Sequence, residues 1–432
     1  MGASLEEIMN RCIRFFLYLL IFWLPYSIAV IESSVITATI LWLVKRSIRA
    51  QKTWDQGSRN WRSLLRAFSP VDSPLNAPIG FFLLVSLVCT LRSVSWGHSW
   101  SGLMTKTLEW FVIYFLVLEV FDHPRSLKIA LGIFLFTSLS TIIDGLFQFH
   151  IFHKDIFAKM VISDGRATGP FPNANQLAGY LTMAIPLALA LWAAAADRRW
   201  RWAAGLAWIS GLWSLMTTFS RGGWLAVLGG FVFIFFLFKR FSWPVILGLA
   251  MTILVCLGIF FTRFEKEIRL EKLEKEKVLT TAFWRKDLWA DSLRMLMDRP
   301  LFGYGPNTYM PAFYEYVQRL HGPGTYEPTY AHNCYLQLAV EYGILGLIAF
   351  LWILATLFFQ TFASVLKPIS DEPQAIFWKA VRIGLSAGLL AFLLHSFVDT
   401  HFFSLRLSVL LWLMIGLLVA VTLTTNRSLN LS

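Results

Sequence analysis

The chain has 432 residues, of which 56% are hydrophobic and only 15% are charged. Soluble proteins carry about 25% charged residues, so this composition excludes a soluble enzyme, a disordered chain and a disulfide-rich secreted module. The net charge of +12 is typical of the excess of Lys and Arg in the cytoplasmic loops of a membrane protein, rather than of nucleic-acid binding.

Apolar runs follow one another along the chain, and each predicts a helix because backbone in lipid must satisfy its own hydrogen bonds. The runs are 13–31, 33–44, 77–95, 103–120, 127–147, 174–195, 203–219, 224–238, 243–262, 333–358, 381–400 and 403–424. The second run is short and indicates either a span or a bent, re-entrant piece of the first hairpin. The pattern predicts an all-α polytopic membrane protein with about twelve transmembrane helices.

Basic residues are distributed unevenly between the connecting segments. If the N-terminus lies in the cytoplasm, the short cytoplasmic segments hold far more Lys and Arg than the short external ones. This bias predicts that both termini face the cytoplasm. Three regions follow: residues 1–262 with nine spans, an external loop domain over 263–332, and residues 333–432 with three spans.

The external loop domain contains two predicted helices. Residues 263–277 carry acidic and basic side chains one helical turn apart, which is typical of a solvated helix without chemistry. Residues 281–298 place Trp and Leu at helical spacing and predict an amphipathic helix that lies against the membrane surface. Pro300 ends that helix, and the Gly- and Pro-rich residues 301–306 predict a tight turn.

Polar residues gather in four places at the external ends of the spans. They are Gly165 to Gln176, Ser220 to Gly223, Arg285 to Trp289, and His332 with Asn333. Three arginines and one histidine on one side of a membrane indicate an anion site with a titratable base, because Arg offers a planar fork to phosphate and His exchanges protons near neutrality. Taken singly, an Arg at a span end is usually a head-group anchor, and an interfacial His is usually structural.

Signals for metal or nucleotide chemistry are missing from the sequence. The nearby acidic residues form no D-x-D or paired-carboxylate motif. The four cysteines have no metal or disulfide spacing, and neither a Walker loop nor a dinucleotide-binding G-x-G-x-x-G is present. We therefore expect no metal, no cofactor and no nucleic-acid partner.

The polar blocks resemble those of the O-antigen ligase/polymerase superfamily. The matching blocks are Thr168 to Tyr180, Ser220 to Ala226, Arg285 to Trp289, and Leu301 to Pro306. The closing block is the most specific, because His332-Asn333, nine residues, Gly343-x-x-Gly346 fits the family pattern H-[NSQ]-x9-G-x-x-G without a gap. The rest of the chain resembles the family in topology, which implies a fold like that of the GT-C glycosyltransferases.

This resemblance implies a metal-independent enzyme of the bacterial inner membrane with its active site facing the periplasm. Such enzymes transfer a glycan, O-antigen or similar, from undecaprenyl diphosphate to an acceptor hydroxyl, and in-line attack gives inversion. By position, Arg221 and Arg285 match the essential arginines of the family, and His332 matches the essential histidine. The residues expected to bind substrate are Arg166, Asn173, Asn175, Asn333 and Lys106.

The identity of the acceptor stays open. If it is the lipid A core, the protein is a ligase; if it is another lipid-linked repeat unit, the protein is a polymerase; we favour the ligase. A flippase of lipid-linked sugars is disfavoured, because transporters place ionisable residues near the midplane and often repeat their halves. Three structural roles stay open as alternatives to a role in binding or catalysis. They are a helix cap at Asn333, a Lys106–Glu109 pair, and a non-catalytic polar network of His395, Asp399, His401 and Arg406.

Overall fold

The computed structural model describes residues 4–55, 61, 67–157, 165–237, 258, 281–322, 329–366 and 372–429, and these form helices and turns without a strand. The helices are α1 (Leu5–Trp23), α2 (Ile28–Asp55), α4 (Asn76–Leu91), α5 (Trp96–Gly102), α6 (Leu108–Val120), α7 (Pro124–Phe147), α8 (Ala174–Ala194), α9 (Arg198–Thr217), α10 (Arg221–Leu237), α12 (Thr281–Asp298), α13 (Tyr309–His321), α14 (Cys334–Val365), α15 (Pro373–His395) and α16 (Leu405–Leu429). Short π-helical turns occupy 103–107 and 148–152, and a 3₁₀ turn occupies 401–403. The predicted all-helical class is therefore confirmed for this part of the chain.

Six of the described helices are long and apolar enough to cross a membrane. They are Ile28–Trp54, Pro124–Phe152, Ala174–Ala194, Cys334–Val365, Pro373–His395 and Leu405–Thr425, and α4 and α10 are shorter apolar helices. The protein is thus a multi-pass membrane protein, whereas the number twelve and the GT-C-like arrangement stay predictions. The predicted span 243–262 and the charged helix 263–277 lie outside the described residues.

The second predicted span differs from the structure. Instead of a short or re-entrant piece, α2 is one continuous helix of 28 residues. The break between the first two helices falls at Pro25, within the turn between α1 and α2, rather than at Glu32. Glu32 interrupts the apolar pattern without interrupting the helix, whereas Pro25 lacks a backbone N–H and cannot continue one.

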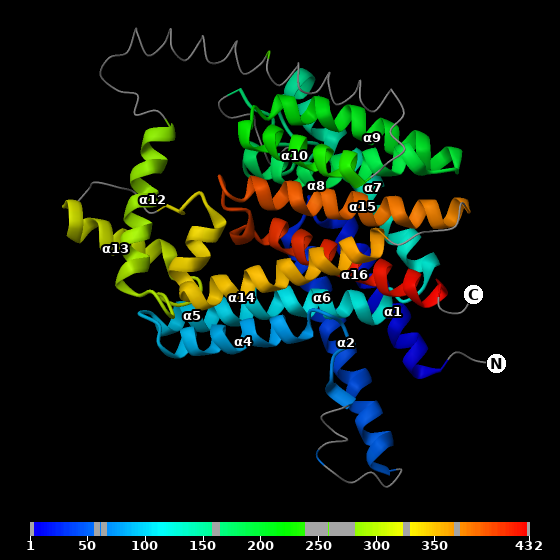
Figure 1. Cartoon of the computed structure of the whole chain (residues 1–432), viewed down its shortest axis with the longest axis horizontal. Coiled ribbons are helices and arrows are strands. Elements are labelled where there is room, and N and C mark those ends of the chain that lie inside the picture. The colour runs from blue at the N-terminus through cyan, green and yellow to red at the C-terminus, as the bar shows by residue number, and fades with distance from the viewer. Residues whose placement is uncertain are drawn as a thin grey trace.

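The helices of the bundle lie side by side, and α12 and α13 gather at one end of it (Figure 1). The predicted amphipathic helix 281–298 is confirmed as α12, which runs across the direction of α14, α15 and α8 (Figure 1). α1 begins and α16 ends at the opposite end of the bundle (Figure 1). The end that carries α12 and α13 is therefore separated from the start of α1 and the end of α16 by the length of the bundle.

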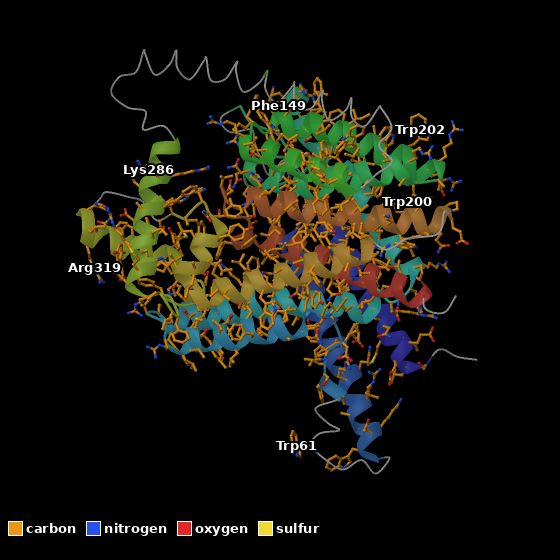
Figure 2. All side chains as sticks on the ribbon, viewed as in Figure 1. Trp61, Phe149, Trp200, Trp202, Lys286 and Arg319 are labelled. Carbon is orange, nitrogen blue, oxygen red and sulfur yellow. The ribbon has the colours of Figure 1, made fainter. Side chains whose placement is uncertain are left out.

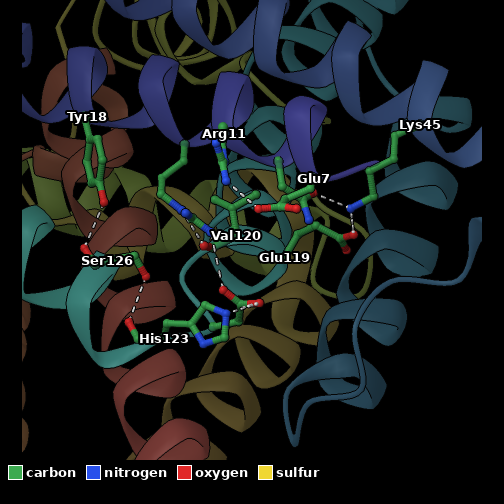
Figure 3. Close-up of polar contacts among 11 residues, drawn as sticks. Glu7, Arg11, Tyr18, Lys45, Glu119, Val120, His123 and Ser126 are labelled. Carbon is green, nitrogen blue, oxygen red and sulfur yellow. Dashed lines mark hydrogen bonds and ion pairs between the residues drawn. The ribbon is translucent and has the colours of Figure 1, made fainter. Parts of the chain in front are cut away.

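A buried charge cluster ties the helices together at that opposite end (Figure 3). Glu119 of α6 accepts hydrogen bonds from Lys45 and Arg46 of α2, and all three side chains are buried. Arg14 of α1 donates to the carbonyl of Val120 at 2.9 Å. Because each buried charge has a partner, these contacts fix α1, α2 and α6 relative to one another.

A kink in α14 holds the turn at 301–306. Gly343 departs from the helix with φ +67°, and a Cβ built there would lie 2.1 Å from the carbonyl oxygen of Leu301. The freed backbone groups bond to the turn, with the amide of Ile344 donating to Pro300 at 2.8 Å and the amide of Tyr304 donating to Val340 at 2.9 Å. Two sequence blocks that lie far apart along the chain, the turn and the G-x-x-G, are thus two halves of one contact.

Replacing Gly343 by Ala is expected to destabilise the fold by about 2–4 kcal/mol, because the new Cβ adds both a left-handed backbone penalty and a clash with Leu301. Thermal unfolding of the purified protein in detergent measures this. Gly80→Ala in α4 is the matched control, since nothing lies within 4 Å of its added Cβ. Equal unfolding midpoints for the two variants would contradict the account of the kink.

Candidate active site

His332 lies directly before α14 in an unusual backbone conformation. Its φ is +47°, a left-handed value that costs free energy in a non-glycine residue and occurs most often at functional sites. The next residue, Asn333, ends this irregular stretch, because its side chain accepts hydrogen bonds from the amides of Tyr335 and Leu336 at 3.1 and 3.0 Å. Asn333 is thus the N-cap of α14, as the alternative interpretation of this residue predicted.

Cys334 attaches the start of α14 to the loop between α15 and α16. Its amide donates to the carbonyl of Ser396 at 2.9 Å, and its thiol donates to the carbonyl of Asp399 at 3.1 Å. The amide of Phe402 in turn donates to the sulfur at 3.3 Å. These bonds bring the loop 396–404, which is distant in sequence, against His332.

The loop presents a carboxylate to the histidine. Oδ1 of Asp399 lies 3.6 Å from Nδ1 of His332, whose side chain is 27% exposed. Burial alone would raise the pKa of Asp399, but the contact with His332 and the neighbouring His401 and His395 lower it well below its usual range. An ionised carboxylate therefore faces Nδ1 of the His332 ring at neutral pH.

The turn before α10 packs on the same loop. Ser220 Oγ lies 3.2 Å from Nε2 of His395. A Cβ built on Gly222 would lie 2.6 Å from Val398 and 3.0 Å from His395. The glycine beside Arg221 therefore gives room to the side chains of Val398 and His395.

Two guanidinium groups near this loop influence each other electrostatically. Arg221 begins α10, and Arg285 lies in the first half of α12. Burial lowers the pKa of Arg285, and so does the positive charge of Arg221, whereas Asp399 raises it. One helical turn along, Trp289 donates its indole N–H to the carbonyl of Ala331 at 2.8 Å, which holds α12 against the residue before His332.

Arg166 joins the turn before α8 to the turn before α10. Its Nε donates to the carbonyl of Thr218 at 2.8 Å, and its Nη2 donates to Oδ1 of Asn175 at 2.7 Å. Asn173 caps α8 by accepting from the amide of Gln176 at 2.9 Å. The segment Gly165 to Gln176 is thus fastened at both of its ends.

A cavity of about 310 Å³ opens between these turns. Its lining residues include Arg166, Asn173, Asn175, Tyr330, His332 and Asp399. This volume lies at the lower end of the range for ligand sites, about 300–1,000 Å³. Among the described residues, no three His, Cys, Asp or Glu side chains are arranged to hold a metal ion.

Lys106 lies in a different place from the other predicted substrate-binding residues. Its ammonium group donates to Oδ1 of Asn307 at 2.6 Å, beside Glu341, whose carboxylate accepts from the amides of Asn307 and Tyr309 at 3.0 and 3.2 Å. The ammonium group of Lys106 thus binds the side chain of Asn307, directly after the turn 301–306, in place of the suggested pairing with Glu109.

The predicted polar network after α15 divides into two parts. The rings of His395 and His401 have centroids 4.3 Å apart and lie beside Asp399. Arg406 instead donates to the carbonyls of Pro25 and Pro170 at 2.8 and 2.5 Å. Sequence reasoning therefore placed Asp399 in a structural network and did not connect it with His332, which lies 67 positions earlier in the chain.

A comparison with protein families identifies the domain that carries this geometry. Residues 206–351, about a third of the chain, match the family model described as O-antigen ligase. This domain match supports a place for the chain in the O-antigen ligase/polymerase superfamily. Members of this superfamily are enzymes of the glycosyltransferase type. The matched residues include Arg221, Arg285 and His332, whereas the cavity residues Arg166, Asn175 and Asp399 lie outside the match. No curated protein matches the chain.

Replacing Asn333 by Ala is expected to cost about 1 kcal/mol of stability, because two amides of the first turn of α14 lose their acceptor. Asn333→Ser should restore most of this loss, since a serine oxygen also caps helices. Thermal unfolding and transfer activity of the purified variants measure the effect. If Asn333→Ser is as stable as the wild type but inactive, the side chain contacts substrate rather than only capping the helix.

Proposed function

We propose that this protein is an inverting, metal-independent glycosyltransferase of the bacterial inner membrane. In this proposal it transfers an O-antigen or similar glycan from undecaprenyl diphosphate to a sugar hydroxyl of the lipid A core, at the periplasmic face. The observation that carries the proposal is that Asp399 faces His332 at the wall of a cavity and also interacts with Arg285, which in turn lies close enough to Arg221 to feel its charge.

The arginines supply the site for the leaving group. Two like charges held close together repel each other, and a bound diphosphate relieves this repulsion while accepting forked hydrogen bonds from both guanidinium groups. The negative charge on the diphosphate grows as the anomeric C–O bond breaks. Arg221 and Arg285 therefore stabilise the transition state more than the ground state.

His332 acts as the general base in this proposal. The acceptor hydroxyl oxygen attacks the anomeric carbon as the C–O bond to the diphosphate breaks, and the hydroxyl proton passes to Nε2 of His332. Asp399, on the Nδ1 side, holds the ring in place and stabilises the imidazolium that forms, as the carboxylate does in a Ser-His-Asp triad. The lipid diphosphate leaves from the face opposite to the attack, which inverts the configuration.

The remaining cavity residues hold the sugars that react. Arg166 and Asn175 form a fixed pair, and together with Asn173 they offer amide and guanidinium groups to sugar hydroxyls beside His332. A polymerase would use the same groups on a different acceptor, so the choice of the lipid A core rests on the resemblance of the sequence blocks rather than on the site.

Conservative and deletion variants separate the roles of the basic residues. Arg221→Lys and Arg285→Lys keep the charge but lose the planar fork, so each is expected to lose most of its activity together with donor affinity. His332→Ala should keep donor affinity while its turnover falls by about 10²–10⁴-fold, the range of general-base catalysis. Donor binding and initial rates of the purified variants measure this difference.

Arg294→Lys is the matched control, because Arg294 lies on α12 like Arg285 but pairs with Asp291, and it should behave as the wild type. If His332→Ala mainly weakened donor binding while kcat at saturating donor stayed normal, His332 would be a diphosphate ligand and the assignment of the base would be wrong.

A further inference from the structure

A second, larger cavity lies at the other end of α12 from Arg285. Its volume is about 610 Å³, which falls in the middle of the range for ligand sites. Its polar lining residues are Asp298, Arg299, Tyr304, Glu315, Tyr316 and Arg319. None of these residues takes part in the site around His332.

The chemistry of this lining differs from that of the anion site. Two carboxylates and two guanidinium groups balance each other in charge, so the cavity does not favour an anion. Burial, and then a hydrogen bond between its hydroxyl and Asp298, raise the pKa of Tyr316. The guanidinium of Arg299 lies over the ring of Tyr304, 5.2 Å from its centroid, which holds a second aromatic ring in place.

Such a lining matches a carbohydrate. Aromatic rings offer apolar faces for the C–H faces of a sugar ring, with a polar tip where the site is wet. Carboxylates accept, and guanidinium groups donate, two hydrogen bonds side by side, which suits neighbouring hydroxyl groups of a sugar.

The position of the cavity is fixed relative to the reacting centre by α12. Arg285 and Asp298 lie 13 residues apart on this one helix, and at a rise of about 1.5 Å per residue this separates them by about 20 Å. Figure 2 shows Lys286, which is next to Arg285 in sequence, and Arg319 in different parts of the bundle end formed by α12 and α13. The amide of Val94 donates to the carbonyl of Tyr304 at 3.0 Å, which attaches the cavity to the bundle after α4.

We propose that this cavity is a glycan subsite. It binds sugar units of the polymer that lie several sugars away from the glycosidic bond that forms at His332. The proposal rests on the proposed transfer of a glycan at His332 and adds a second point of attachment for the same polymer. A glycan held at both places lies along α12, which orients its reacting end without any added contact at the anomeric carbon.

Substrates of different length test this subsite. The wild type and the variants Tyr316→Ala and Arg319→Ala receive either a lipid diphosphate donor with a single sugar or one with a long glycan, at a fixed acceptor. The measured quantity is the kcat/KM of the long donor divided by that of the short donor. We expect this ratio to fall about tenfold in both variants, the equivalent of about 1.4 kcal/mol. The fall should come from a higher KM for the long donor, with kcat unchanged.

A second arm keeps the donor fixed and varies the length of the acceptor saccharide. A fall of the ratio in the first arm assigns the subsite to the donor glycan, and a fall in the second arm assigns it to the acceptor. Tyr314→Ala is the matched control, because Tyr314 is an exposed tyrosine of the same helix and does not belong to the polar lining. A variant that is only misfolded lowers kcat/KM for both lengths equally, and ratios that stay at the wild-type value in both arms overturn the proposal.

Direct binding separates this proposal from the proposed function. Free oligosaccharide without lipid or diphosphate is titrated onto the purified protein, so no transfer is needed. We expect the wild type and Tyr314→Ala to bind it and Arg319→Ala to bind it about tenfold more weakly. Equal binding by all three proteins, or none by the wild type, overturns the subsite whether or not the protein transfers glycans.

Discussion

The bond from Arg166 to the carbonyl of Thr218, the contact of Ser220 with His395 and the bonds around Cys334 hold four interhelical segments together at one end of the bundle. Each turn leaves backbone groups without partners inside its own helix, and at a buried bundle end those groups must find partners in another turn. The site forms because each turn supplies hydrogen-bond partners for polar groups of another turn. His332, Arg221 and Asp399 come from separate turns and would not meet without this constraint.

Charge explains what the assembled turns are able to do. Asp399 is ionised and faces Nδ1 of His332, which places a negative charge beside the proposed base. Arg221 and Arg285 lie close enough to affect each other, which makes this place suited to a strongly anionic group. The cavity beside His332 is lined by amides, hydroxyl groups, one guanidinium group and the carboxylate of Asp399, which suits hydroxyl-bearing sugars. These features are what the proposed transfer from a lipid diphosphate glycan requires at this end of the bundle.

Much of the helical structure of the described residues was predictable from the sequence, and Arg221, Arg285 and His332 could be chosen as candidate site residues, because apolar runs and short motifs are local signals. Residues 281–298 were predicted as an amphipathic helix, and α12 has these bounds. The role of Asp399 was not predictable, since its contact with His332 depends on the packing of α14 against the last hairpin. Cys334 looked uninformative for the same reason.

Lys106 was grouped with the substrate-binding residues because it lies at a span end, but its partner Asn307 is supplied by a distant turn. The second span was misjudged at Glu32, because hydropathy falls at a charged residue even where the helix continues.

The most direct test of the central claim is transfer by the purified protein in liposomes. A labelled glycan on undecaprenyl diphosphate is supplied together with lipid A core and, in a parallel reaction, with a second lipid-linked repeat unit instead. The account predicts that the label appears on the lipid A core, joined with inverted anomeric configuration. Label that appears only on the second repeat unit would show a polymerase, and label that never leaves the donor would contradict glycan transfer altogether.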